Sequence, residues 1–130
     1  MRAIEAEITG ELGHVLVVRL PRDVADETSA AIRREAESRL PRIQGAGLVL
    51  DFGEVALLNS IGITTLLQMQ DRCRQQGVRL LLARVPDRIG KFFETLRLHK
   101  RFEIIASVDA AVAMIERGSQ PGGSVAAPRE

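Results

Sequence analysis

Residues 48–82 read LVLDFGEVALLNSIGITTLLQMQDRCRQQGVRLLL, and they carry the strongest structural signals of the chain. The continuous apolar run Leu48–Phe52 is typical of a strand that is buried on both faces of a sheet. After a short loop, apolar residues at helical spacing predict a helix over Ile61–Gln75. A second apolar run, Val78–Ala83, predicts another buried strand. A strand, a helix and a strand in this order predict a right-handed parallel unit.

The flanking sequence predicts further strands and helices. Strands are expected at Ala3–Ile8, His14–Leu20 and Phe102–Ile105, and helices at Asp26–Leu40, Pro86–Leu96 and Ser107–Arg117. Asp26 or Thr28 can cap the first helix, and Ser107 can cap the last one. We therefore expect residues 1–117 to form one α/β domain, with a mixed, mainly parallel sheet of four to five strands, an antiparallel N-terminal edge strand and about four helices. Residues 118–130 are rich in Gly, Pro, Ser and Ala, which predicts a disordered tail.

The composition is ordinary for a globular protein, with 45% hydrophobic and 27% charged residues. The net charge is +1, and the sequence has no Trp or Tyr for base stacking, so we expect no nucleic-acid partner. There is no apolar run long enough to span a bilayer and no signal peptide, so we expect a cytoplasmic protein without membrane insertion. The single cysteine, Cys73, cannot form an internal disulfide and is expected to be structural.

Motifs that would indicate an enzyme are missing from the sequence. His14 and His99 do not have the spacing of metal ligands, and there is no glycine-rich nucleotide loop. Ser60 lacks the preceding glycine of a nucleophile elbow. We therefore expect no catalytic residue, no metal and no cofactor. Asp51, at the end of its strand, is expected to bond loop amides.

Ser60 stands with Asn59 at the expected start of the second helix, where two interpretations are open. Ser or Asn at this place is usually an N-cap that bonds the free amides of the first turn. A hydroxyl at the positive end of the helix dipole is also a favourable position for a phosphoryl group. The loop Pro21–Asp23 is expected to lie beside this helix start, because the carboxyl ends of parallel strands share one edge of a sheet.

The segment LDFGEVALLNSIGI, residues 50–63, resembles the signature of the STAS domain family, the bacterial anti-sigma factor antagonists. In that family an apolar strand ends in Asp, and a short loop leads to Asp-Ser-Ser/Thr-Gly at the start of a helix. By position, Ser60 matches the phosphorylatable serine of the family, and Gly62 matches its glycine. Asn59 stands where the family usually has Asp, and Ile61 stands where it usually has a second Ser or Thr.

The resemblance covers residues 3–116 and implies a regulatory module that is not an enzyme. The implied partner is a serine-protein kinase that is also an anti-sigma factor, with ATP and Mg²⁺ bound by the kinase. Phosphorylation of Ser60 is then the event that breaks the contact. The implied contact surface consists of Pro21, Arg22, Asp23, Asn59, Ser60, Ile61, Gly62 and Thr64.

A second hypothesis is a STAS scaffold or accessory subunit that is never phosphorylated. Such a subunit would belong to a stress-sensing complex or to a lipid-transport ATPase. The departures at Asn59 and Ile61 favour this alternative. The oligomeric state is left open by the sequence.

Overall fold

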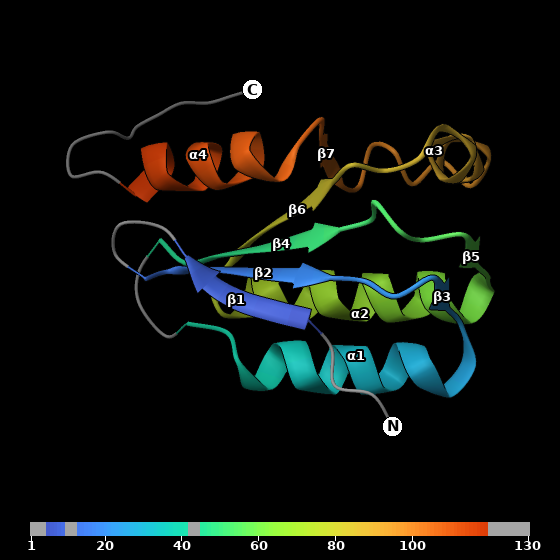
Figure 1. Ribbon diagram of the computed structural model, residues 1–130, viewed down its shortest axis with the longest axis horizontal. Coiled ribbons are helices and arrows are strands. Elements are labelled where there is room, and N and C mark those ends of the chain that lie inside the picture. Colours follow the sequence, from blue (N-terminus) through green and yellow to red (C-terminus); the bar gives the residue numbers. More distant parts are fainter. Residues whose placement is uncertain (1–4, 10–12, 42–44, 120–130) are drawn as a thin grey trace.

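The computed structural model describes residues 5–9, 13–41 and 45–119, which form a sheet between two layers of helices (Figure 1). The strands are β1 (Glu5–Thr9), β2 (Val15–Arg19), β3 (Asp23–Val24), β4 (Gly47–Asp51), β5 (Leu57–Leu58), β6 (Arg79–Ala83) and β7 (Glu103–Ile105). The helices are α1 (Asp26–Ser38), α2 (Ser60–Gln75), α3 (Asp87–Thr95) and α4 (Val108–Ser119).

Five of the strands form one mixed sheet in the order β1-β2-β4-β6-β7. The edge strand β1 is antiparallel to β2, and the other neighbouring pairs are parallel. In the middle of the sheet, Val49 of β4 lies between Val17 of β2 and Leu81 of β6. All five residues of β4 are buried, as the continuous apolar run predicts. The predicted α/β class, with its antiparallel edge strand and four helices, is therefore confirmed.

The two faces of the sheet are covered differently. Helices α1 and α2 lie on one face, and α4 lies on the other (Figure 1). The first face carries the larger apolar cluster, which includes Leu48, Leu50 and Phe52. On the other face, Ile115 of α4 lies directly over Gly47, where an added Cβ would be 2.3 Å from its Cδ1. The alternation along β4 sends successive side chains into the two clusters, so one strand holds both layers together.

The predicted caps are right at one helix and wrong at another. The Oγ of Ser107 accepts a hydrogen bond from the N–H of Ala110 at 3.0 Å, so Ser107 caps α4 as expected. At α1 the N-cap is Ala25, whose backbone is extended and whose side chain makes no capping hydrogen bond. The chain is already helical at Asp26, two residues after the end of β3. Neither Asp26 nor Thr28 therefore stands at the capping position.

The short strands β3 and β5 were not expected from the sequence. They form a separate two-stranded parallel sheet beyond the carboxyl ends of β2 and β4 (Figure 1). Two residues are too few to produce a recognisable periodicity. Helix α4 runs to Ser119, two residues past its predicted end at Arg117. The predicted turn Gly10–Gly13, the start of the first strand and residues 120–130 of the predicted tail fall wholly or mostly outside the described residues.

Candidate functional site

The predicted switch serine is the first residue of α2. Asn59 has an extended backbone (φ −118°, ψ −173°), and its Oδ1 accepts a hydrogen bond from the N–H of Gly62 at 3.1 Å. Asn59 is therefore the N-cap, and the interpretation of Ser60 as the cap is wrong. Asn59 stands one position before the helix, and the oxygen of its side-chain amide reaches the N–H of Gly62, the third helical residue. Ser60 does not stand at the capping position, because the chain is already helical there. Capping thus leaves the side chain of Ser60 exposed at the N-terminal end of the helix.

Gly62 allows the start of α2 to press against β3. A Cβ at this position would lie 2.3 Å from the carbonyl oxygen of Val24 and 2.6 Å from the Cδ1 of Leu58. Both distances are far below ordinary van der Waals contact, and one of them is to backbone. The close approach of the helix to β3 therefore depends on the missing side chain of Gly62.

The loop after β2 lies beside the segment that leads to Ser60. The carbonyl oxygen of Arg22 accepts hydrogen bonds from the N–H groups of Ala56 and Leu57, at 2.8 Å and 3.0 Å. Next along the chain, Asp23 is paired with Leu57 in the parallel register of β3 and β5. The expected proximity of the Pro21–Asp23 loop and the start of α2 is thus confirmed.

The predicted contact residues differ in their exposure. Arg22, Asp23, Ser60, Ile61 and Thr64 are exposed, Pro21 and Asn59 are partly buried, and Gly62 is buried. Among these, Gly62 has no side chain to offer a partner, and its burial assigns it to the packing of α2 on β3. The exposed members therefore come from the loop before β3, from the first residue of β3 and from the first turns of α2.

Leu57 is a surface residue that the sequence analysis missed. Its side chain is 52% exposed, and that of Ile61, four residues later, is 47% exposed. Both side chains flank Ser60 in the sequence, one in β5 and one in the first turn of α2. Large exposed aliphatic side chains that gather in one place are typical of interaction surfaces. Leu57 could be found only by knowing that β5 turns Leu58 inward and Leu57 outward.

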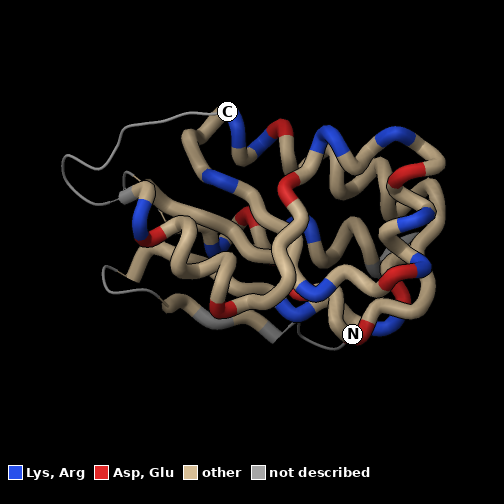
Figure 2. The backbone as a smooth tube through the Cα atoms, turned by 90° about the horizontal axis from the view of Figure 1, so that it is seen from above, with Lys and Arg blue, Asp and Glu red and all other residues tan. Residues whose placement is uncertain are grey.

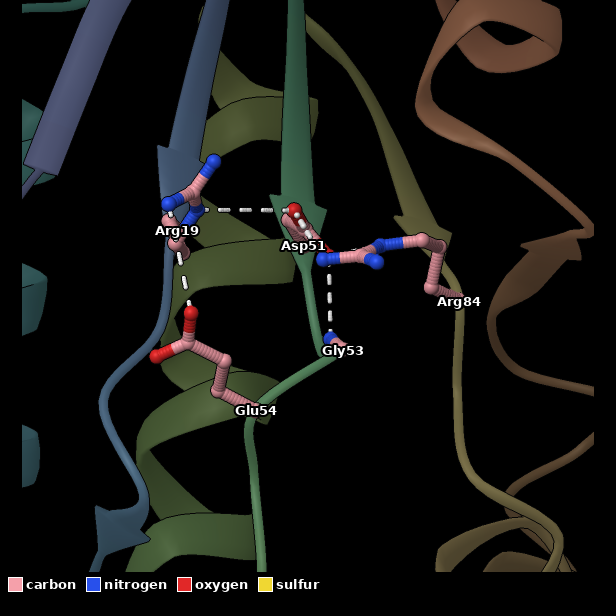
Figure 3. Close-up of polar contacts among 5 residues, drawn as sticks. All are labelled: Arg19, Asp51, Gly53, Glu54 and Arg84. Atoms are coloured by element: carbon pink, nitrogen blue, oxygen red, sulfur yellow. Dashed lines mark hydrogen bonds and ion pairs between the residues drawn. The ribbon is translucent and has the colours of Figure 1, made fainter.

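Asp51, at the end of β4, is the centre of a charged network that joins β2, the loop after β4 and the segment after β6 (Figure 3). Its Oδ1 accepts hydrogen bonds from the N–H of Gly53 at 2.9 Å and from the Nε of Arg84 at 2.8 Å, while its Oδ2 accepts one from the Nη2 of Arg84 at 3.0 Å. The Nε of Arg19 in β2 lies 3.9 Å from the Oδ2 of Asp51, and its Nη1 lies 3.9 Å from the Oε2 of Glu54. The expected bond of Asp51 to a loop amide is confirmed, and Arg84 is the partner that the sequence analysis missed.

The network stabilises the ionised form of Asp51. Asp51 is only 4% exposed, and burial alone would raise the pKa of its carboxyl group. The hydrogen bonds from Arg84 and Gly53 and the positive charges of Arg84 and Arg19 outweigh burial and hold the pKa of Asp51 below its usual value of 3.8. Asp51 is therefore a permanently charged anchor at neutral pH, and every oxygen of it is engaged in holding neighbouring segments.

The other chemically reactive side chains lie apart from Ser60. His14 is buried just before β2, at the opposite end of the strand from the Ser60 surface, and His99 is exposed after α3. Cys73 is buried in α2. No group of three or more His, Cys, Asp or Glu side chains that could hold a metal ion occurs within residues 5–9, 13–41 and 45–119. Acidic and basic residues are interspersed along the described chain (Figure 2).

Helices that could cross a membrane are likewise missing from the part of the chain that the structure describes. The longest of the four helices, α2, has 16 residues and carries several charged side chains.

Comparisons with known proteins identify the fold. Three solved structures cover most of this chain at low sequence identity, and each is therefore similar to it in fold alone. A STAS-domain anti-sigma factor antagonist from Planctomyces limnophilus has a TM-score of 0.75 at 13% identity, over 88% of this chain and 98% of its own. The phosphorylated form of the Bacillus cell fate determinant SpoIIAA has a TM-score of 0.64 at 18% identity, over 87% and 99%. A sulfate transporter family protein from Wolinella succinogenes has a TM-score of 0.61 at 17% identity, over 79% and 85%.

A search of curated protein sequences gave no match. The family model described as STAS domain matches residues 3–111, which is most of the chain. STAS domains are regulatory and interaction modules and are not typically enzymes. The fold, the sheet order and this match lead to one conclusion: the chain belongs to the STAS domain family.

Proposed function

We propose that this protein is an anti-sigma factor antagonist-like regulatory module of the bacterial cytoplasm. It binds a serine-protein kinase that also acts as an anti-sigma factor, and phosphorylation at Ser60 releases that partner. The functional unit is the domain over residues 1–117, with the remaining residues as a tail. The observation that carries the proposal is the position of Ser60, exposed at the start of α2 and not used as the cap.

The surroundings of Ser60 suit a switch. A phosphoryl group adds a charge of about −2 and is stabilised at the positive end of a helix. In the sequence, the residue that would carry this charge stands between Leu57 and Ile61, whose side chains are exposed. A partner that buries these apolar side chains would then also have to remove water from a phosphate, which is costly. Phosphorylation is therefore expected to be tolerated by the free domain and to oppose the complex.

The contact surface in this proposal is the exposed part of the predicted set together with Leu57. Arg22 and Asp23 supply charge, and Ile61 and Leu57 supply apolar area. Apolar area together with charged side chains is the usual make-up of a protein–protein contact.

The proposal is tested by intact-mass spectrometry after incubation with ATP, Mg²⁺ and the serine kinase encoded nearest to this gene. We expect one added phosphate on the wild type and none on Ser60→Ala. Thr64→Ala is the matched control, because Thr64 is the exposed hydroxyl one turn further along α2. Phosphate on Ser60→Ala, or loss of the phosphate in Thr64→Ala but not in Ser60→Ala, would show that Ser60 is not the modified residue.

A second candidate function is a STAS scaffold or accessory subunit without phosphorylation. The observation in its favour is Ile61, which exposes a large apolar side chain at a position where the family usually has a hydroxyl. The fold likeness to a sulfate transporter family protein is compatible with such a role. A stable complex with a partner, in the absence of any phosphate on the wild-type chain, would favour this candidate.

A further inference from the structure

The Gly53–Leu57 loop, which follows β4 and includes the first residue of β5, leads to Asn59 and Ser60 and is held from two sides. On the side of β2, the carbonyl oxygen of Arg22 accepts two hydrogen bonds from the end of the loop. On the side of β6 and α3, two arginine side chains reach the loop, Arg84 at its start and Arg88 at Ala56.

Arg84 is bonded to the strand end that precedes the loop and covers the first residue of the loop. Its guanidinium makes two hydrogen bonds to Asp51, which itself accepts the N–H of Gly53 (Figure 3). The guanidinium also lies over Gly53, since a Cβ there would be 2.2 Å from the Nη2 of Arg84. The conformation of the loop at Gly53 and the position of Arg84 are therefore mutually dependent.

The backbone of Arg84 is in a conformation that L-residues rarely adopt. Its φ is +57°, in the left-handed region that favours glycine. Its N–H is bonded to the carbonyl oxygen of Ile105 of β7 at 3.2 Å, which fixes the orientation of this peptide. An arginine here is unfavourable for the backbone, and the contacts of its side chain to Asp51 provide the compensation.

Arg88 holds the loop at Ala56. Its Nη2 donates a hydrogen bond to the carbonyl oxygen of Ala56 at 2.6 Å, while the N–H of Ala56 donates to the carbonyl oxygen of Arg22. Ala56 is thus held through its carbonyl by α3 and through its N–H by the loop after β2. Val55 and Leu58 are buried, so Leu57 is the large apolar side chain of this segment that is turned outward.

We propose that Arg84 and Arg88 are positioning residues that fix the Gly53–Leu57 loop and thereby the presentation of Leu57 and Ser60. The two arginines come from one short segment that runs from the end of β6 to the first turn of α3. This segment therefore holds the contact surface in position. The effect on partner binding rests on the proposed function, whereas the effect on the loop does not.

The test compares Arg84→Gly with Arg97→Gly. Both arginines have a positive φ, +57° and +61°, so glycine relieves the same backbone cost and adds the same freedom to the unfolded chain. Arg97 follows α3 and makes none of the contacts described above, which makes it the matched control. Arg88→Ala tests the second contact by itself.

The first readout is amide hydrogen exchange, which needs no partner. In Arg84→Gly we expect exchange at Gly53, Ala56 and Leu57 to become at least about tenfold faster, with amides of β4 within about twofold of the wild type. Arg97→Gly is expected to leave all of these unchanged. Unchanged exchange of the loop in Arg84→Gly would overturn the proposal, and so would a uniform acceleration throughout the sheet.

The second readout is the affinity for the kinase and the rate of phosphorylation of Ser60. We expect both to fall at least about fivefold in Arg84→Gly and to be unchanged in Arg97→Gly. If the wild type is phosphorylated at Ser60 and Arg84→Gly matches it in both quantities, the positioning role is overturned. If no kinase binds or modifies the wild type, the proposed function fails, and hydrogen exchange decides the positioning of the loop without it.

Discussion

Two helical glycines, Gly62 and Gly90, illustrate how differently the same substitution acts at the residue scale. A Cβ at Gly62 would collide with the backbone of Val24, whereas a Cβ at Gly90 of α3 would meet nothing within 4 Å. We expect Gly62→Ala to lower the free energy of unfolding by about 1–3 kcal/mol, because α2 must move away from β3. Gly90→Ala is expected to raise it by about 0.5–1 kcal/mol, since alanine is the better helix former.

Denaturant titration of the two variants against the wild type measures both effects. A Gly62→Ala protein as stable as the wild type would show that the start of α2 can shift without cost. In that case the close contact between α2 and β3 could not be what fixes the position of Ser60.

At the scale of single residues, the sequence predicted which residue types lie at the start of α2 better than it predicted their conformations and contacts. The pattern Asn59-Ser60-Ile61-Gly62 marked the start of α2 correctly, because polar residues before an apolar helix have few alternatives. It did not show which residue caps the helix, since Asn and Ser are equally good caps. Arg84 was beyond prediction, because nothing local marks an arginine as left-handed when its compensating contact lies 33 residues away.

At the scale of elements, the ends of β4 and β6 are joined by the pair of Asp51 and Arg84. The pKa of Asp51 is lowered in the folded protein, so folding favours the ionised carboxylate. The resulting stabilisation is fully present above about pH 5, where this group is ionised in the unfolded chain as well. It is lost as the pH falls through 3.8 toward the lower pKa of the folded state.

The comparison of wild type with Asp51→Asn makes this dependence visible. We expect Asp51→Asn to be less stable at pH 7, and we expect the difference to narrow as the pH falls below about 4. Thermal or denaturant unfolding at several pH values measures it. A difference that is the same at pH 3 and pH 7 would mean that the charge of Asp51 does not contribute to the stability of this junction.

The long elements were predictable, and the short ones were not. Each of the nine predicted strands and helices has a counterpart at about the expected place, and β4 is the best example. The pair β3 and β5 is held by backbone bonds between segments that are more than 30 residues apart, and neither has a pattern of its own. Because these two strands turn Leu57 outward, the part of the surface that was missed is the part built by them.

At the scale of the whole molecule, Cys73 reports on the integrity of the packed helices and sheet. Cys73 is 2% exposed, and burial together with the charge of Glu37 raises the pKa of its thiol to about 12. A thiol reagent such as 5,5′-dithiobis(2-nitrobenzoate) reacts with the thiolate, so native Cys73 is expected to react at least about 100-fold more slowly than in denaturant. Reaction at the unfolded rate under native conditions would show that α2 opens freely from the core.

The arrangement of the entire domain brings the proposed surface together. The parallel order β2-β4-β6 places the carboxyl ends of three strands at one end of the sheet, and the crossover helices carry the chain back to the opposite end, where the next strand starts. The sequence predicted this topology because the connections leave few alternatives. The sequence could not predict that the segment after β6 holds the loop after β4 in position. That contact depends on hydrogen bonds from arginine side chains to residues far away in the sequence.

The central claim is that Ser60 switches the affinity of this domain for a partner kinase. Its most direct test is a titration of the kinase against the unphosphorylated domain and against the domain phosphorylated at Ser60, followed by fluorescence anisotropy or calorimetry. We predict that the phosphorylated domain binds at least about tenfold more weakly, which corresponds to about 1.4 kcal/mol. Equal affinities of the two forms for the kinase would contradict the account.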